Sequence, residues 1–230
     1  MSSFIVEFWS RVFTLLGKLS IFALISFMFP KAKSSYAFAD AWVLGHLLLA
    51  FVSVIIVSHL PNGSVISTII VVYGLLRVFE IAVYQVNVLL FGEYRAIKQG
   101  QSYALYGYRR IVLLLLHNYV EIILWLGCTY TVFATDYTHK WEGGASTMLG
   151  AIYSSFITMT TFGDFDLMPR SNLAAIILLF HATIGLFMTL LSLARFISLI
   201  PTPKTLDPTE QTQIEQSKLP QPIHTDDKLN

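Results

Sequence analysis

Long apolar stretches dominate the chain and set its expected architecture. Four of them are long enough to cross a bilayer as helices, which takes about 20 predominantly apolar residues, and they cover residues 41–60, 65–91, 111–134 and 173–200. A fifth apolar run, residues 145–158, is too short to span and is typical of a re-entrant segment. The pattern predicts an all-α integral membrane protein with four transmembrane helices and one half-span helix.

Residues 1–30 combine an amphipathic pattern with a short apolar one. At helical spacing, residues 3–19 place polar or small side chains on one stripe and aromatic and aliphatic side chains on the other face, as in Ser3, Glu7, Ser10, Thr14 and Gly17 against Phe4, Phe8, Trp9, Val12, Phe13 and Leu16. With Arg11 and Lys18 beside the stripe, this favours a helix lying in the membrane interface. The apolar run 19–29 ends at Pro30, so a fifth span formed with the preceding helix is the alternative.

Charge predicts the orientation of the chain in a cell membrane. The connector 92–110 carries four basic residues against one acidic residue, and with Lys31, Lys33, Arg195 and Lys204 it falls on the side of the two termini. The opposite side holds more acidic than basic residues. Because cytosolic loops are enriched in lysine and arginine, both termini and the connector are expected in the cytosol. Residues 41–91 then form two peripheral helices, and the polar, proline-rich residues 201–230 are expected to be a disordered tail.

Composition agrees with a membrane protein and excludes several other classes. The 230 residues are 55% hydrophobic and only 13% charged, and the net charge of +1 argues against a nucleic-acid partner. Cys128 is the single cysteine, so no intrachain disulfide is possible. No cofactor motif and no metal-ligand spacing is found. An intramembrane enzyme would use His117, Asn118, Glu121 and His181 as a metal or acid/base site, and His117 and Glu121 share one helix face. Two residues at helical spacing are common by chance and no nucleophile motif accompanies them, so we do not expect enzymatic activity.

The most specific motif lies between the third and fourth predicted spans. Residues 158–169 read Thr-Met-Thr-Thr-Phe-Gly-Asp-Phe-Asp-Leu-Met-Pro. They resemble the filter of the tetrameric potassium-channel superfamily, T-x-T-T-V-G-Y-G-D-x-x-P, with matches at Thr158, Thr160, Thr161, Gly163, Asp166 and Pro169. The resemblance extends over residues 111–200, as outer helix, pore helix, filter and inner helix. It implies a cation-conducting homotetramer, since one pore loop per chain needs four chains for a closed ring.

The resemblance assigns the filter to Thr161, Phe162, Gly163, Asp164 and Phe165, whose backbone carbonyls would replace the water shell of K⁺ or Na⁺. Asp164 resembles the weakly selective sodium/potassium channels of the NaK type, which also place Asp after the first Gly. Phe165 replaces a glycine that the family uses for positive φ. The alternative to a conducting channel is therefore a channel-like subunit or membrane scaffold that does not conduct. No regulatory partner can be named from the sequence.

Two further sets of polar residues lie inside the predicted spans. The last span carries a helical stripe, which is expected to line a pore or, alternatively, to pack against other helices: His181, Gly185, Thr189, Ser192 and Phe196. Arg77 and Glu80 share one face of the second span, and Glu121 lies equally deep in the third. Because a charge at the bilayer centre costs at least about 2.5 kcal/mol, Arg77 is expected to pair with Glu80 or Glu121. The interpretations of this cluster are a structural ion pair and a gating or proton-sensing group.

Overall fold

The computed structural model describes residues 3–18, 20, 36–61, 63–100, 108–139, 143–160 and 167–199. In chain order the elements are α1 (Phe4–Lys18), α4 (Tyr36–His59), α5 (Val65–Leu89), α6 (Gly92–Lys98), α7 (Tyr108–Val132), η1 (Ala134–Asp136), β1 (Tyr137–Thr138), η2 (Gly144–Ser146), α8 (Met148–Thr160), β2 (Met168–Pro169) and α9 (Asn172–Leu199). Apart from the two-residue strands and the connecting turns, the described chain is helical, as predicted. The apolar run 19–29 and the tail 201–230 lie outside the described residues, except for Ser20.

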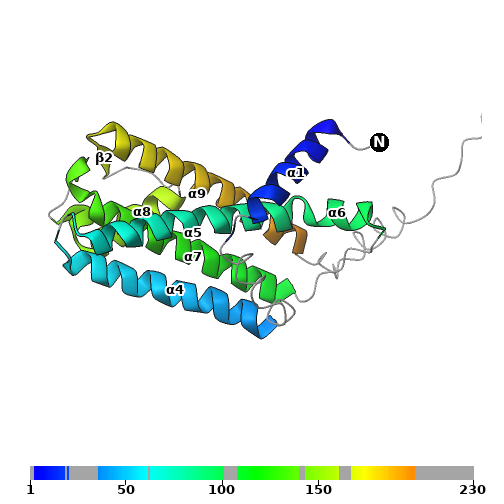
Figure 1. Cartoon of the computed structure of the whole chain (residues 1–230), viewed down its shortest axis with the longest axis horizontal. Coiled ribbons are helices and arrows are strands. Elements are labelled where there is room, and N and C mark those ends of the chain that lie inside the picture. Colours follow the sequence, from blue (N-terminus) through cyan, green and yellow to red (C-terminus); the bar gives the residue numbers. More distant parts are fainter. Residues whose placement is uncertain are drawn as a thin grey trace, which may run out of the picture. The chain divides into compact units, whose positions relative to one another are not determined.

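Four helices, α4, α5, α7 and α9, are long and apolar enough to cross a membrane. This confirms the predicted number of spans among the described residues and indicates a multi-pass membrane protein. Helix α7 packs against both α4 and α5 (Figure 1). We call the end of the bundle where α4 and α7 finish the β end, because β1 follows α7 there. The opposite end, where α5 finishes and α6 follows, is called the α6 end.

The core of the α4–α5–α7 bundle is aliphatic and aromatic. Val54, Val78, Ile122, Trp125 and Leu126 are almost completely buried in one cluster. The indole of Trp125 lies against Gly74, where a Cβ would come within 2.8 Å of the ring, so glycine at this position allows α5 and α7 to approach closely.

Helix α1 packs on the α6 end of α5. The Asn87 side-chain amide donates a hydrogen bond to the Phe13 carbonyl at 2.7 Å, and the Phe13 and Phe91 rings lie 5.8 Å apart. The oxygen of the same Asn87 side chain accepts a bond from Arg95 of α6 at 2.6 Å. Asn87, to which sequence reasoning assigned no role, therefore joins α1, α5 and α6.

Glu7 forms a second link between α1 and α6, and this link is expected to depend on pH. The Lys98 ammonium donates to its Oε1 at 3.1 Å and the Arg11 guanidinium at 2.8 Å, and these contacts, Lys98 first, lower the pKa of Glu7. A lowered carboxyl pKa means that the contact stabilises the docked helix above the ordinary glutamate pKa, and that this contribution is lost as pH falls through the lowered value. Replacing Lys98 with alanine should raise the pKa of Glu7, as measured by carbon NMR titration. Arg11→Ala should raise it less, and an unchanged titration in Lys98→Ala would exclude the link.

Two short strands tie the β end together. Tyr137 pairs with Pro169, and Thr138 pairs with Met168, in an antiparallel bridge between β1 and β2. The Tyr137 hydroxyl donates to the Ala174 carbonyl in the first turn of α9 at 3.1 Å. Burial of Tyr137 raises the pKa of its hydroxyl, which keeps the donor proton in place. The chain therefore enters α9 next to the end of α7.

Candidate functional site

Helix α8 descends beside α7 for only half of the length of α7. Its 13 residues give a length of about 20 Å. The two helices are antiparallel: Gly127 faces Ala151, and four residues further along α8 the Ser155 hydroxyl donates to the Ile123 carbonyl at 2.7 Å. Another four residues along, the Tyr119 hydroxyl donates to the Met159 carbonyl at 3.2 Å. This regular register carries α8 from the β end of α7 to its middle.

Small and hydroxyl side chains let α8 approach its neighbours. Its buried face repeats them at intervals of three or four residues: Gly150, Ala151, Ser154, Ser155 and Thr158, followed by Met159. Such residues allow close contact between helix backbones in membranes. Sequence reasoning recognised the helix but missed this stripe, although its spacing is readable in the sequence.

The carboxyl end of α8 lies against the middle of two spans. The Tyr119 hydroxyl, which bonds the Met159 carbonyl, is also 3.3 Å from the Thr189 hydroxyl of α9. On the other side, a Cβ added to Gly185 would come within 2.8 Å of the same Met159 carbonyl oxygen. Met159 is therefore held between α7 and α9 halfway along both. The carboxyl end of a helix carries a partial negative charge, so this end of α8 makes the centre of the bundle electronegative.

The amino end of α8 is capped by Thr147. Its side-chain oxygen accepts a hydrogen bond from the Gly150 backbone amide at 3.1 Å. The neighbouring Ser146 does not cap the helix, because its hydroxyl donates to the Gly143 carbonyl. Gly143 and Gly144 have φ values of +89° and +39°, and this turn delays the helix to Met148.

The described chain resumes at the β end. Thr160 ends α8 at mid-length of α7, while Leu167 is buried beside Tyr130 and Tyr137, directly before the β1–β2 bridge. Helix α8 thus begins at the β end and ends midway along α7. Seven residues later, at Leu167, the chain is at the β end again. Five of the intervening residues are those predicted to form a filter, and they lie outside the described residues: Thr161, Phe162, Gly163, Asp164 and Phe165.

The structure places the predicted pore-lining residues of α9 in different environments. His181 is completely buried, and its Nδ1 lies 2.7 Å from the Tyr130 hydroxyl of α7. Gly185 packs on Met159. A residue enclosed in its own chain cannot line an aqueous path, so for His181 and Gly185 the structure favours the packing alternative. Ser192 is half-buried and bonds the Met188 carbonyl at 2.6 Å, whereas Phe196 is exposed; a pore-lining role stays a prediction for Thr189, Ser192 and Phe196.

The three intramembrane charges form one buried cluster on the other face of α7. The Arg77 guanidinium donates to Glu121 from Nε at 2.8 Å and from Nη2 at 3.3 Å, and to Glu80 from Nη1 at 2.8 Å. Glu121 also accepts the Trp125 indole N–H at 3.2 Å. The sequence posed Glu80 and Glu121 as alternative partners, and the structure shows that Arg77 binds both. Charge-assisted bonds of this kind offset the cost of burial in the membrane.

Polar and aromatic side chains extend this cluster into α4. The Arg77 guanidinium lies 5.8 Å from the centre of the Trp42 ring. His46 Nδ1 lies 2.8 Å from the Trp42 carbonyl, and Nε2 lies 2.8 Å from the Tyr73 hydroxyl. Since a carbonyl only accepts, the ring donates at Nδ1 and accepts the Tyr73 proton at Nε2. The sequence gave no basis for assigning His46, because both partners depend on the fold.

No protein-family model, curated protein or solved structure matches this chain.

The residues of the enzymatic alternative do not converge. His117 bonds the Leu113 carbonyl of its own helix at 2.6 Å, Glu121 is engaged by Arg77, and His181 contacts Tyr130. Among the described residues no group of three or more histidine, cysteine, aspartate or glutamate side chains is placed to hold a metal ion.

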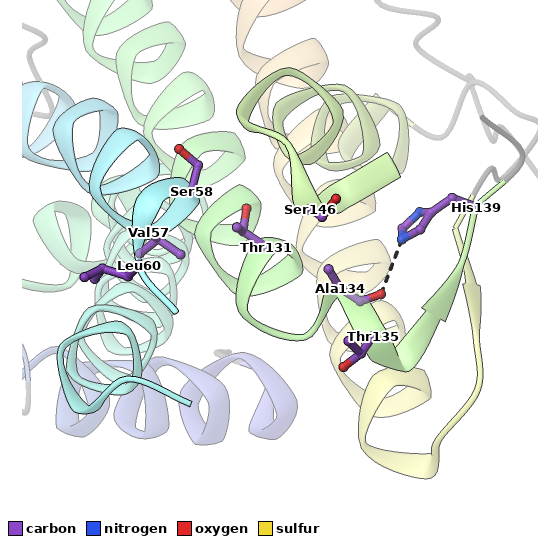
Figure 2. Close-up of a pocket in the computed structure, with 8 residues that line it drawn as sticks. All are labelled: Val57, Ser58, Leu60, Thr131, Ala134, Thr135, His139 and Ser146. Atoms are coloured by element: carbon purple, nitrogen blue, oxygen red, sulfur yellow. Dashed lines mark hydrogen bonds between the residues drawn. The ribbon is translucent and has the colours of Figure 1, made fainter. Parts of the chain in front are cut away.

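A pocket of about 230 Å³ opens at the β end between α4, α7, η1 and η2 (Figure 2). Several of its hydroxyls are already bonded to carbonyls of their own segments, as Ser58 is to Ile55 and Thr131 to Gly127. The His139 ring is held by a 3.4 Å bond from Nε2 to the Ala134 carbonyl. We assign no ligand to this pocket. Its lining is Val57, Ser58, Leu60, Thr131, Ala134, Thr135, His139 and Ser146.

Proposed function

We propose that the chain is a subunit of a monovalent cation channel, with α7, α8 and α9 contributing one quarter of a tetrameric pore. The observation that carries this proposal is the half-span helix α8, which ends at Met159 and Thr160 midway along two spans. Backbone that is not helical is tolerated at membrane depth only inside protein or against water. A chain that stops halfway and returns to the same end fits a pore loop, and the motif of residues 158–169 lies at this place.

The direction of α8 favours cations. Its carboxyl end lies at the centre of the bundle, and the partial negative charge of its last carbonyls would stabilise a cation there. In the orientation that the positive-inside rule favours, the β end faces outward, and acidic residues in this part of the sequence raise the local cation concentration: Asp136, Glu142, Asp164 and Asp166.

Apolar side chains of α8 and α9 are exposed in the single chain. Leu149 and Phe156 are exposed on α8, as are Leu186 and Leu190 on α9. In the proposed tetramer these surfaces meet neighbouring copies or lipid, whereas α4 and α5 remain at the periphery. Cross-linking in native-like bilayers tests this arrangement, and a strictly monomeric chain would contradict it.

Conduction is tested by the reversal potential of the purified protein in a planar bilayer, with K⁺ on one side and Na⁺ on the other. Because Asp164 stands where selective channels carry an aromatic residue, we expect a cation current that reverses near zero. Asp164→Tyr should shift the reversal potential toward the K⁺ equilibrium potential. The matched control is Asp136→Asn, which removes an acidic side chain of the same region outside the motif and should leave the reversal potential unchanged.

The outcomes separate the proposal from its alternative. An anion current, or equal shifts in Asp164→Tyr and Asp136→Asn, would contradict a filter at this motif. A demonstrable tetramer without current at any voltage, in both wild type and Phe165→Gly, would favour the non-conducting subunit. Current that appears only in Phe165→Gly would identify Phe165 as the block.

A further inference from the structure

Helix α1 packs on the protein with the side that carries Ser10, Phe13 and Gly17, and most of its other apolar side chains face outward. Ser10 is its only buried residue, and Gly17 lies close enough to α5 that a Cβ would be 3.2 Å from the Asn87 amide. Glu7 on the same stripe binds Lys98 of α6. A surface helix of a water-soluble protein buries its apolar stripe against the core, whereas α1 leaves most of its apolar side chains exposed.

The outward face of α1 is apolar with a basic edge. Phe4 is 80% exposed, Ile5 66% and Leu15 62%, and Phe8 and Trp9 are about half exposed. At 100° per residue, Arg11 and Lys18 fall directly beside Phe4 and Leu15 on this face. The Arg11 side chain is 77% exposed although it contacts Glu7. Long basic side chains at such an edge can bury their methylene groups while the charge reaches the headgroups.

The position of α1 in the fold fits a membrane surface. It is fixed to Asn87, near the end of the 25-residue span α5, which is where a spanning helix leaves the hydrocarbon. Arg95 and Lys98 of α6 lie at the same end. A second copy of the chain is a less suitable occupant, because a symmetric contact through this face would bring the basic edges of two α1 helices together.

We propose that the outward face of α1 lies in the headgroup layer of the membrane and binds anionic phospholipids, with Phe4, Phe8 and Leu15 inserted and Arg11 and Lys18 at the phosphates. Aromatic and aliphatic side chains flanked by basic ones are typical of helices that lie in this layer, and each basic residue adds attraction to acidic lipids. This inference does not depend on ion conduction.

The test uses the full chain reconstituted into phosphatidylcholine vesicles with and without phosphatidylglycerol. Cys128 is completely buried, so the wild-type chain gives the labelling blank. An environment-sensitive fluorophore is placed at Phe8→Cys on the outward face and, as the matched control, at Thr14→Cys on the polar stripe. Brominated lipids should quench the label at position 8 strongly and the label at position 14 weakly, and phosphatidylglycerol should increase the quenching at position 8.

The role of the two basic residues is tested with the same fluorophore at position 8. Adding Arg11→Gln and Lys18→Gln to Phe8→Cys should remove the increase caused by phosphatidylglycerol. Equal quenching at positions 8 and 14 would overturn insertion, and an increase that survives both glutamine substitutions would overturn the role of the basic edge. A label at position 8 that brominated lipid does not reach, and whose emission depends on the protein-to-lipid ratio, would show that a second copy covers the face.

Discussion

Replacing Arg77 with leucine is expected to lower the free energy of unfolding by about 3–5 kcal/mol, because it leaves two carboxylates buried without their cation. Glu121 loses both guanidinium bonds and keeps the Trp125 indole bond, while Glu80 loses its bond to Arg77 at 2.8 Å. The measurement is equilibrium unfolding in mixed detergent micelles, followed by helical circular dichroism. This substitution should be among the most destabilising in the chain.

Two further variants separate charge from packing. Arg110→Leu breaks a half-exposed pair with Asp40 at 2.7 Å and should cost no more than about 1 kcal/mol. Replacing Arg77, Glu80 and Glu121 together with leucine removes all three charges and should recover most of the stability, since buried ion pairs are often no more stable than apolar side chains of similar volume. If Arg77→Leu and Arg110→Leu cost the same, the buried cluster is not the main electrostatic contact of the bundle.

Replacing Gly150 with alanine is expected to disrupt the start of α8. A Cβ there would lie 1.7 Å from the Gly144 carbonyl oxygen, and because that oxygen is backbone it cannot move without shifting η2. Overpacking of this kind typically costs about 1–3 kcal/mol, and the displacement should also weaken the Thr147 cap. Unfolding in the same micelles gives the loss of stability, and limited proteolysis after Lys140 reports whether η2 has moved.

Gly45→Ala is the matched control for this prediction. Gly45 lies within α4, and a Cβ at this position would meet nothing within 4 Å. Its substitution should change the free energy of unfolding by no more than about 1 kcal/mol, in the stabilising direction, since alanine is the better helix former. A similar loss in both variants would mean that glycine flexibility, not the approach of η2 to α8, determines the effect at position 150.

The four spans and the half-span helix could be predicted from the sequence, because each depends on the length of one continuous apolar stretch. The helix bounds differ in places. Residue 41 was the expected start of the first span, whereas α4 begins at Tyr36, and Asp40 within it is paired with Arg110 of α7. Likewise, residue 145 was the expected start of α8, whereas the glycine turn at 143–144 delays the helix to Met148.

Individual residues of the candidate site could be predicted from the sequence, but not which partners they contact in the fold. The Arg77–Glu80 pair follows from spacing on one helix, but the bidentate contact of Arg77 with Glu121 requires the packing of α5 on α7. The periodicity of His181 and Gly185 shows that one face of α9 is special, yet small and polar residues suit water and close helix contacts equally. Only the positions of Tyr130 and Met159 distinguish the two.

The central position of α7 has a consequence for biogenesis. Helix α7 completes the charge cluster with α5 on one face and supports α8 through Ile123 and Tyr119 on another. During synthesis the amino-terminal part of a chain folds first, so α7, against which α8 packs, is made before α8. A 13-residue helix is too short to be retained as a span by itself. Helix α7 therefore precedes α8 in synthesis, whereas α9, which packs on Met159 from the other side, follows it.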